Sequence, residues 1–208
     1  HYGGKSAIQS GLLDRVKKAL DEENIAYCLC GGVVANPLLS KVNEGIQFCK
    51  EEGVDFILAV GGGSVLDSSK GIAYGVYNEG AVWDYYARKK KMKGALPMGC
   101  ILTLSATGSE MSNSSVITNE DGNLKRGLSS DYGYFKFSIL NPELTYTVSR
   151  YQTMCGCTDI IMHTLERYFT PYQTLDLVDQ MAESLVRTVI KNAKILLEDP
   201  SNEQARSE

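Results

Sequence analysis

The sequence predicts an α/β protein in which a parallel sheet with crossover helices is followed by helices alone. Two near-continuous apolar runs, residues 54–60 and 98–104, are typical of strands that are covered on both faces. The first run leads through the glycines at 61–63 into a helical pattern. This succession of strand, tight turn and helix favours a parallel sheet with crossover connections.

The second part of the chain has helical patterns only. After Tyr151 we find no strand signal, and residues 151–169 and 175–199 both have apolar side chains at helical spacing. We therefore predict an α/β domain over residues 1–145 and the first helices of an all-helical domain over residues 146–208. These few helices cannot close a core of their own.

Shorter elements complete the predicted α/β domain. A helix follows the glycine turn at residues 3–4, with Ser6 as its candidate N-terminal cap. The remaining elements are a strand at 25–30, a helix from Pro37 closed by Gly53, a hairpin with its turn at Asp121-Gly122, and a strand at 137–140.

Composition and charge exclude several classes of function. The net charge of −4 and the single basic run, Arg88–Lys91 with Lys93, do not form the basic stripe of a nucleic-acid-binding protein. We interpret this run as a solvated loop. No stretch approaches the ~20 apolar residues that a membrane span needs. We expect neither a nucleic acid nor a membrane as partner.

The cysteines do not have the spacing of a zinc ribbon. The pairs Cys28/Cys30 and Cys155/Cys157 are each C-x-C, whereas a ribbon uses paired C-x-x-C. We interpret the six cysteines as buried free thiols in a reducing compartment, and we predict a cytoplasmic protein.

A glycine-rich turn between a strand and a helix is the first candidate site. In "VGGGSVLDSSK" (60–70), glycines let the backbone approach a ligand, and the N-terminus of the helix that follows favours a phosphate. Asp67 lies one helical turn in, where it can accept hydrogen bonds from a ribose or an amide. The pattern matches neither of the standard nucleotide fingerprints, so a purely structural tight turn is the alternative.

Hydroxyl side chains follow the next strand. Thr103, Ser105 and Thr107 stand at its carboxyl end, with further serines at 109 and 112. Ligands of open parallel sheets lie just beyond such strand ends. A serine-rich loop without a ligand is the alternative, and by itself the pattern favours that alternative.

Asp159 and His163 are the third candidate. Four residues apart in a predicted helix, they share one face, with Glu166 a turn further along. A carboxylate and an imidazole together suit iron, zinc or manganese. A hydrogen-bonded structural pair is the alternative, because a catalytic metal usually takes three or more protein ligands.

Taken together, these segments resemble the iron-containing (group III) alcohol dehydrogenases, within the branch of NADP-dependent butanol dehydrogenases and aldehyde reductases. No single motif decides the resemblance, but the set in this order is specific. It runs through residues 2–6, Asn36-Pro37, 60–70, 102–112, 116–125, 140–145 and 156–168. The resemblance implies a Rossmann-like dinucleotide-binding domain, followed by the start of a helical metal-binding domain, in the amino-terminal half of the family's architecture.

The resemblance also implies roles for individual residues. Gly62, Gly63 and Ser64 would hold the cofactor pyrophosphate, and Asp67 the nicotinamide end. The residues that would lie along the cofactor are Thr103, Ser105, Thr107 and Lys125. Asp159 and His163 would be the first two metal ligands, and two more histidines would follow further along a longer chain. Asn141, Ser105-Ala106 and Cys157-Thr158 depart from the family's usual residues.

The loop at the beginning of the chain bears on the cofactor. NAD-preferring relatives tend to carry an acidic residue after the first strand, where it repels a 2′-phosphate. This chain has Gly3, Gly4, Lys5 and Ser6 there, with no acidic residue. Lys5 and Ser6 can contact the 2′-phosphate as cation and donor, so we expect Gly3, Gly4 and Ser6 at the cofactor and favour NADP over NAD.

The predicted function is metal-dependent hydride transfer between a primary alcohol or aldehyde and NAD(P), with Fe²⁺, or else Zn²⁺ or Mn²⁺, as the metal. No residue is predicted as a general base, and catalysis is expected to centre on the metal. A dehydroquinate-synthase-like lyase is one alternative. The other is a fragment that only binds the dinucleotide, and we expect the 208 residues alone to be inactive. A homodimer is the family's habit.

Overall fold

The computed structural model describes residues 1–171 and 175–208, apart from the side chain of Lys5. The chain divides into two compact units. The α/β unit comprises residues 1–103 and 107–140, and the helical unit comprises residues 104–106 and 141–208. The domain boundary at 145/146 stays a prediction.

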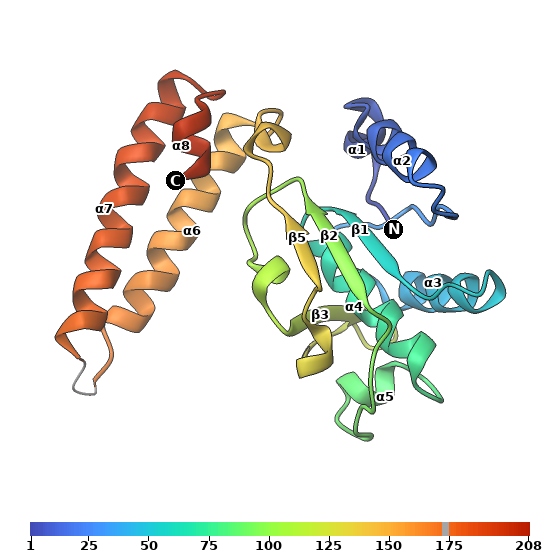
Figure 1. Cartoon of the computed structure of the whole chain (residues 1–208). Helices are drawn as coiled ribbons and strands as arrows, with labels where there is room; N and C mark the ends of the chain where they lie inside the picture. Colours follow the sequence, from blue (N-terminus) through green and yellow to red (C-terminus); the bar gives the residue numbers. More distant parts are fainter. Residues whose placement is uncertain (172–174) are drawn as a thin grey trace. The chain divides into compact units, whose positions relative to one another are not determined.

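A parallel sheet forms the centre of the α/β unit. Its strands are β1 (Ile57–Gly61), β2 (Met98–Leu102) and β5 (Phe137–Ile139), which lie side by side in the order β1-β2-β5 (Figure 1). Tyr2 adds an isolated parallel bridge to Val60 on the free side of β1. The strands predicted at 54–60, 98–104 and 137–140 are thereby confirmed as parallel neighbours.

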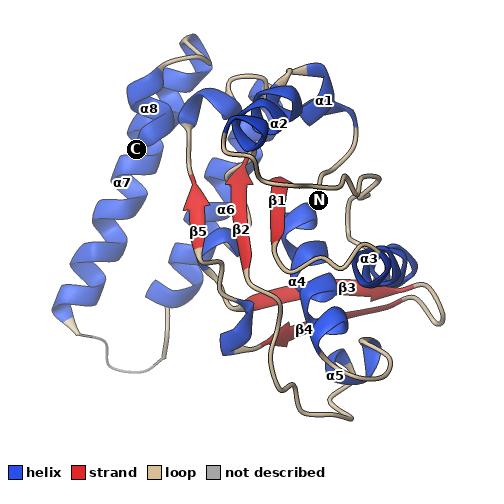
Figure 2. Ribbon diagram, turned by 45° about the vertical axis from the view of Figure 1, so that its right-hand side comes forward, coloured by secondary structure: helices blue, strands red, loops and turns tan. Residues whose placement is uncertain are grey.

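Helix α4 (Gly63–Tyr77) is the most deeply buried helix of the described part of the chain. It packs against β1, β3 and α3 (Leu39–Glu51), so it is covered on several sides (Figure 2). Small residues allow this approach: a Cβ atom on Gly75 would lie 2.7 Å from Ile46 Cγ1, and one on Gly71 would lie 3.1 Å from Val42 Cγ1. The buried residues of the resulting core include Val42, Leu66, Ile72, Tyr74, Met98 and Ile117.

The hairpin predicted around residue 121 is confirmed. Strands β3 (Ser114–Asn119) and β4 (Leu124–Ser129) pair antiparallel. The turn between them has Gly122 at φ 76° and Asn123 at φ 52°, which are left-handed conformations that glycine and asparagine tolerate best. Three short helices complete the unit, namely α5 (Trp83–Tyr86), η1 (Ser109–Met111) and η2 (Asp131–Gly133).

The beginnings of two helices differ from the prediction. The helix expected after residues 3–4 is broken into α1 (Lys5–Gln9) and α2 (Leu12–Glu22), because Gly11 adopts a left-handed φ of 72°. Gly4, and not Ser6, is the N-cap of α1, so the capping role of Ser6 was wrong. Helix α3 begins at Leu39, two residues after Pro37, and ends before Gly53 at φ 64° as expected.

The strand predicted at residues 25–30 does not form. A strand needs a ladder of backbone hydrogen bonds, and this segment receives one such bond, from the Tyr2 N–H to the Cys30 carbonyl (3.0 Å). Ile25, Tyr27 and Leu29 remain exposed. The strand prediction was therefore wrong: this apolar segment has too few backbone partners to form a strand.

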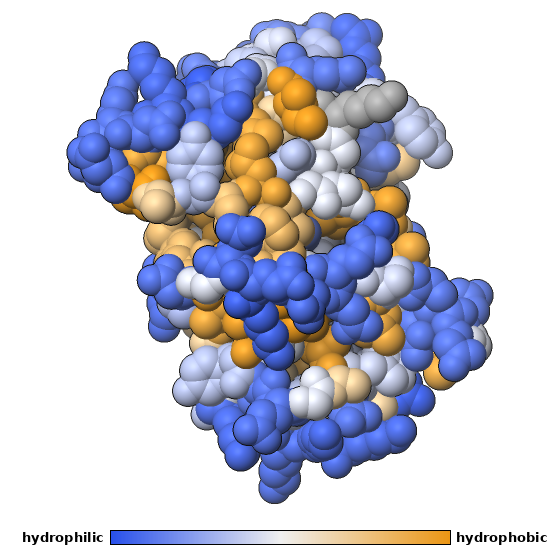
Figure 3. All heavy atoms as spheres, turned by 90° about the vertical axis from the view of Figure 1, so that its right-hand side faces the viewer, coloured by the Kyte–Doolittle hydropathy of each residue, from blue (hydrophilic) through white to orange (hydrophobic). Residues whose placement is uncertain are grey.

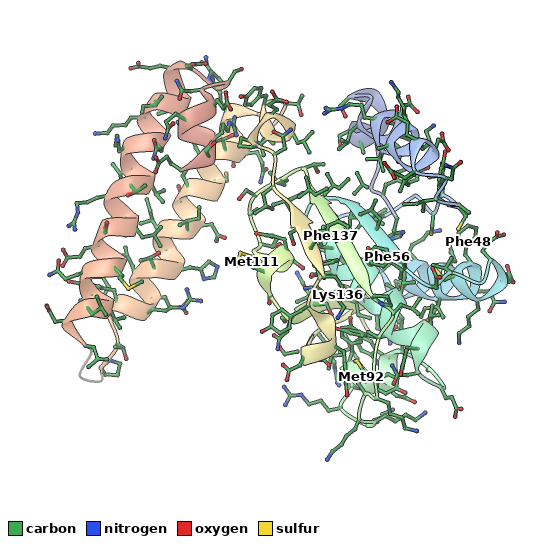
Figure 4. All side chains as sticks on the ribbon, viewed as in Figure 1. Phe48, Phe56, Met92, Met111, Lys136 and Phe137 are labelled. Carbon is green, nitrogen blue, oxygen red and sulfur yellow. The ribbon has the colours of Figure 1, made fainter. Side chains whose placement is uncertain are left out.

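An apolar pocket of about 850 Å³ lies between this segment, α2, the end of α3 and β1. Figure 3 shows apolar side chains gathered at the surface on this side of the molecule. The rings of Phe56 and Phe137 stack at its edge with centroids 6.0 Å apart (Figure 4). Its lining includes none of the residues predicted to contact a dinucleotide, so we do not assign the pocket to that site.

The helical unit is built around an antiparallel pair, α6 (Arg150–Tyr168) and α7 (Asp176–Glu198), preceded by η3 (Pro142–Thr145) and followed by α8 (Glu203–Ser207). The Ser149 hydroxyl caps α6 by accepting a hydrogen bond from the Gln152 N–H. Large apolar side chains of α7, such as Leu177 and Met181, are exposed. The pair therefore leaves much of its apolar surface uncovered, as its small number of helices predicts.

Within the described residues, none of the helices combines the length and the apolar character that crossing a membrane requires. All six cysteines are free. Cys49 and Cys100 are buried as predicted, whereas Cys155 is exposed on α6. The other three, Cys28, Cys30 and Cys157, are half-buried. The cytoplasmic location stays a prediction.

Candidate dinucleotide site and metal-ligand pair

The turn between β1 and α4, residues 61–64, forms what we call the glycine corner. Strand β1 ends at Gly61, Gly62 is extended, and α4 begins at Gly63. The carbonyl of Gly62 accepts from Val65 and Leu66, and no side chain caps the first turn of α4. The first N–H groups of this 15-residue helix thus retain their capacity to bind an anion.

Close packing explains two of the glycines. A Cβ atom on Gly61 would lie 2.5 Å from Val65 Cγ2, and one on Gly63 would lie 2.6 Å from Thr107 Cγ2. Neither glycine has a positive φ. The close approach of neighbouring side chains, rather than backbone freedom, therefore requires glycine here.

Several residues predicted to contact the cofactor lie around this corner. The Thr107 side chain rests on Gly63, and the Thr103 N–H donates to the Gly61 carbonyl at 3.0 Å. Gly3 lies next to Val65, because a Cβ there would be 3.1 Å from Val65 Cγ2. The structure thus brings together Gly3, the glycine corner and two residues that follow β2, Thr103 and Thr107.

Four further residues of the predicted site differ in how they are placed. Nothing lies within 4 Å of the position of a Cβ on Gly4, and Ser6 is exposed on α1. The side chain of Lys5, which was expected to contact a 2′-phosphate, lies outside the described part of the chain. Ser64 is half-buried in the first turn of α4.

Both carboxylate oxygens of Asp67 accept hydrogen bonds from other residues of the α/β unit. Its Oδ1 accepts from Ser109 Oγ at 2.7 Å and its Oδ2 accepts from the Val116 N–H at 3.0 Å. Burial raises the pKa of this carboxyl, while the two hydrogen bonds oppose the shift. A role of Asp67 toward the ligand was predicted, but its partners Ser109 and Val116 were not, since no periodicity links them to α4.

Lys125 on β4 meets the loop before α3. Its Nζ donates to Asn36 Oδ1 at 2.8 Å, and Asn36 has a φ of 55°. The positive charge of Lys125 also acts to lower the pKa of Asp67. Two motifs that are 89 residues apart in the chain are therefore in contact here.

Ser105, Asp159 and His163 belong to the helical unit. The Ser105 carbonyl is 3.9 Å from the position of a Cβ on Gly156, so it lies against α6. On the same helix, His163 Nε2 is 3.6 Å from Asp159 Oδ2, and His163 Nδ1 is 3.7 Å from Glu166 Oε2. The Asp159 and His163 side chains are 61% and 60% exposed.

The Asp159–His163 pair has the donor chemistry of part of a metal site. One carboxylate and one imidazole on adjacent turns suit a divalent transition metal. Among the residues that the structure describes, no group of three or more His, Cys, Asp or Glu side chains is arranged to hold a metal ion. The pair therefore fits two ligands of such a site and does not complete it.

Comparison with known proteins decides the family. The family model of the iron-containing alcohol dehydrogenases matches residues 1–142, which include the glycine corner and its surroundings. The chain belongs to the iron-containing alcohol dehydrogenase family. The resemblance drawn from the motifs is thereby confirmed.

Relatives within this family match almost the whole chain. A probable NADH-dependent butanol dehydrogenase of Bacillus subtilis (strain 168) is 46% identical, over 99% of this chain and 53% of its own length. An NADPH-dependent aldehyde reductase of Escherichia coli (strain K12) is 34% identical, over 99% of this chain and 54% of its own. The chain spans about half the length of these relatives.

A solved structure confirms the fold. The crystal structure of an NADH-dependent butanol dehydrogenase from Thermotoga maritima superposes with a TM-score of 0.94 at 41% sequence identity, over 99% of this chain and 51% of that one. The predicted α/β architecture with a parallel sheet, followed by helices, is shared with this member of the family.

Proposed function

We propose that this chain is part of a metal-dependent alcohol dehydrogenase or aldehyde reductase that transfers hydride between a primary alcohol or aldehyde and a nicotinamide dinucleotide. The observation that carries the proposal is the glycine corner, where uncapped amides of α4 lie under Thr107 in a chain of this family. The names of its relatives, which include butanol dehydrogenases and an aldehyde reductase, support the reaction class.

The residues of this chain would bind and orient the reactants. The first-turn amides of α4 would hold the pyrophosphate of the dinucleotide, since helix N-termini favour anions. Thr103 and Thr107 would direct hydroxyl groups along it, and Asp159 with His163 would supply charge and geometry to a divalent metal. When bound, the dinucleotide supplies the hydride carrier and the metal supplies a Lewis acid.

The choice of dinucleotide rests on two opposed observations. The loop that contains Gly3, Gly4 and Ser6 has no acidic residue that would repel a 2′-phosphate, which favours NADP. The relative at 46% identity is named NADH-dependent, which favours NAD. Separate titrations with NADPH and NADH, followed by the fluorescence of the reduced nicotinamide, measure the preference directly.

For the 208 residues by themselves, we propose dinucleotide binding without turnover. This second proposal rests on the absence of a group of three metal-ligating side chains among the described residues. Its test compares the chain with a longer protein that carries the same sequence. Both should bind the dinucleotide, whereas bound metal and NAD(P)H-linked reduction of butanal should be found in the longer protein alone. Failure of both proteins to bind either dinucleotide would overturn the proposed function.

A further inference from the structure

Lys70 is a charged residue that the proposed site has not used. It lies on α4, one turn after Asp67, and its side chain has no exposed surface (0%). Lysine is almost never fully buried unless its ammonium group is paired. The partners that compensate its charge therefore identify what this residue does.

The Lys70 ammonium group binds one segment of the chain, residues 109–114. Its Nζ donates to the Ser109 carbonyl (2.8 Å), the Ser112 carbonyl (2.7 Å) and the Ser114 carbonyl (2.8 Å), and to Ser109 Oγ (3.0 Å). Three protons serve four acceptors, so two acceptors share one proton. The Phe135 ring lies 5.2 Å away and adds a cation–π contact.

Ser109 joins Lys70 to Asp67. Its hydroxyl accepts from Lys70 and donates to Asp67 Oδ1, so the cation, the hydroxyl and the carboxylate form one buried chain. The other Asp67 oxygen holds the Val116 N–H. Asp67 and Lys70, on consecutive turns of α4, thus hold the chain at several points from Ser109 to Val116.

The same segment leads back to the glycine corner. The Ser109 N–H donates to Thr107 Oγ1 at 3.4 Å, and the Thr107 side chain packs on Gly63. Between Thr107 and Ser114, the one regular element is the single turn η1 (Ser109–Met111). Hydrogen bonds to the ammonium group therefore take the place of secondary structure in holding Thr107 over the first turn of α4.

We propose that Lys70 is a positioning residue of the dinucleotide site, whose buried positive charge fixes residues 107–116 over the glycine corner. The proposal rests on the proposed function, because it assigns to Lys70 part of the affinity for the dinucleotide. Lys70 does not touch the ligand; it acts through Ser109 and Thr107.

The charge of Lys70 can be varied without mutation. Burial lowers the pKa of Lys70 to about 8, while the charges of Asp67, Cys100 and Glu110 oppose the shift. At pH 7 the ammonium form dominates. By pH 9.5 the neutral amine dominates, and its two N–H groups face four acceptors. The affinity for the dinucleotide should therefore fall as the pH rises through 8.

The test compares dinucleotide affinity in the wild type, Lys70→Met and Lys18→Met between pH 7 and pH 9.5. Lys18 is a matched control, because it is exposed on α2. At pH 7 we expect Lys70→Met to weaken binding about tenfold, because the acceptors of residues 109–114 lose their shared donor and the segment is held less firmly. The ratio between Lys70→Met and the wild type should approach one by pH 9.5, whereas Lys18→Met should follow the wild type throughout.

A second variant covers the case in which Lys70→Met does not fold. Ser109→Ala removes the shared hydroxyl and keeps the charge, and we expect it to weaken binding by roughly threefold at pH 7. A folded Lys70→Met with wild-type affinity, or wild-type affinity that does not change from pH 7 to 9.5, would overturn the proposal. If the wild type binds no dinucleotide at pH 7, the proposed function itself fails, and this proposal fails with it.

Discussion

Gly63→Ala offers a direct test of the packing at the glycine corner. The added Cβ atom would lie 2.6 Å from Thr107 Cγ2 and 3.0 Å from Thr107 Cβ. Carbon atoms in contact are normally 3.5–4.0 Å apart, so Thr107 must move by roughly 1 Å. Thr107 is β-branched and Ser109 holds its hydroxyl, so a rotation about χ1 cannot relieve the overlap at low cost.

The expected loss of stability is about 1–3 kcal/mol, which is usual for a methyl group inserted into a packed site. Urea unfolding followed by circular dichroism measures it. Gly127→Ala on β4 is the matched control, because a Cβ there would meet only ordinary contacts, 3.8 Å from Val116 Cγ2, and its φ is not positive. We expect the unfolding midpoint of Gly127→Ala to stay close to that of the wild type.

A double-mutant cycle isolates the contact itself. Thr107→Ala removes Cγ2 and Oγ1, so Gly63→Ala should cost at least 1 kcal/mol less in the Thr107→Ala background than in the wild type. Strictly additive effects would show that Thr107 does not pack on Gly63, and the reasoning about the corner would be refuted.

Three further predictions concern the core, the thiols and the metal pair. Leu66→Ala, at a position with no exposed surface, should cost about 2–5 kcal/mol in urea unfolding, well above Leu124→Ala, whose side chain is 43% exposed. Burial raises the pKa of the Cys49 thiol from 9.0 to about 11. As the pH rises above 9, the thiol therefore ionises first in the unfolded state. The contribution of the protonated thiol to folding stability, which is complete below pH 9, is lost as the pH rises to 11. The stability difference between the wild type and Cys49→Ala should shrink over that window by about 2–3 kcal/mol, and a constant difference would contradict it. In a longer protein that carries this sequence, His163→Ala should abolish metal-dependent turnover and lower the metal content measured by mass spectrometry, while dinucleotide affinity stays unchanged.

The parts of the fold that local patterns determine could be predicted from the sequence. Continuous apolar runs revealed β1 and β2, and the Asp121-Gly122 pair revealed the β3–β4 turn. The segment 25–30 has a similar apolar pattern but forms no strand, because strand formation also depends on backbone partners elsewhere in the chain. Periodicity reports which side chains prefer burial, and it does not report which backbone groups are paired.

In the candidate site, too, features that are local in the sequence could be predicted, whereas contacts between distant positions could not. The glycine turn and the Asp159–His163 pair are local in sequence, so spacing alone could identify them. The buried network of Lys70, Asp67 and Ser109 joins positions about 40 residues apart, and no spacing rule anticipates it. A lysine in an apolar helix is normally assigned to its exposed face. The four oxygen atoms that reverse this assignment belong to residues 109–114, whose sequence gives no sign of a contact with α4.

These observations give α4 three simultaneous functions. Its first turn presents the amides of the proposed dinucleotide site, its second and third turns hold residues 107–116 through Asp67 and Lys70, and its apolar side chains fill the core between β1, β3 and α3. A change that moves α4 should therefore affect stability and dinucleotide affinity together, whereas Lys70→Met should affect affinity in a pH-dependent way. The pH dependence separates the two effects, because a displaced helix has no reason to recover its affinity relative to the wild type when Lys70 loses its proton.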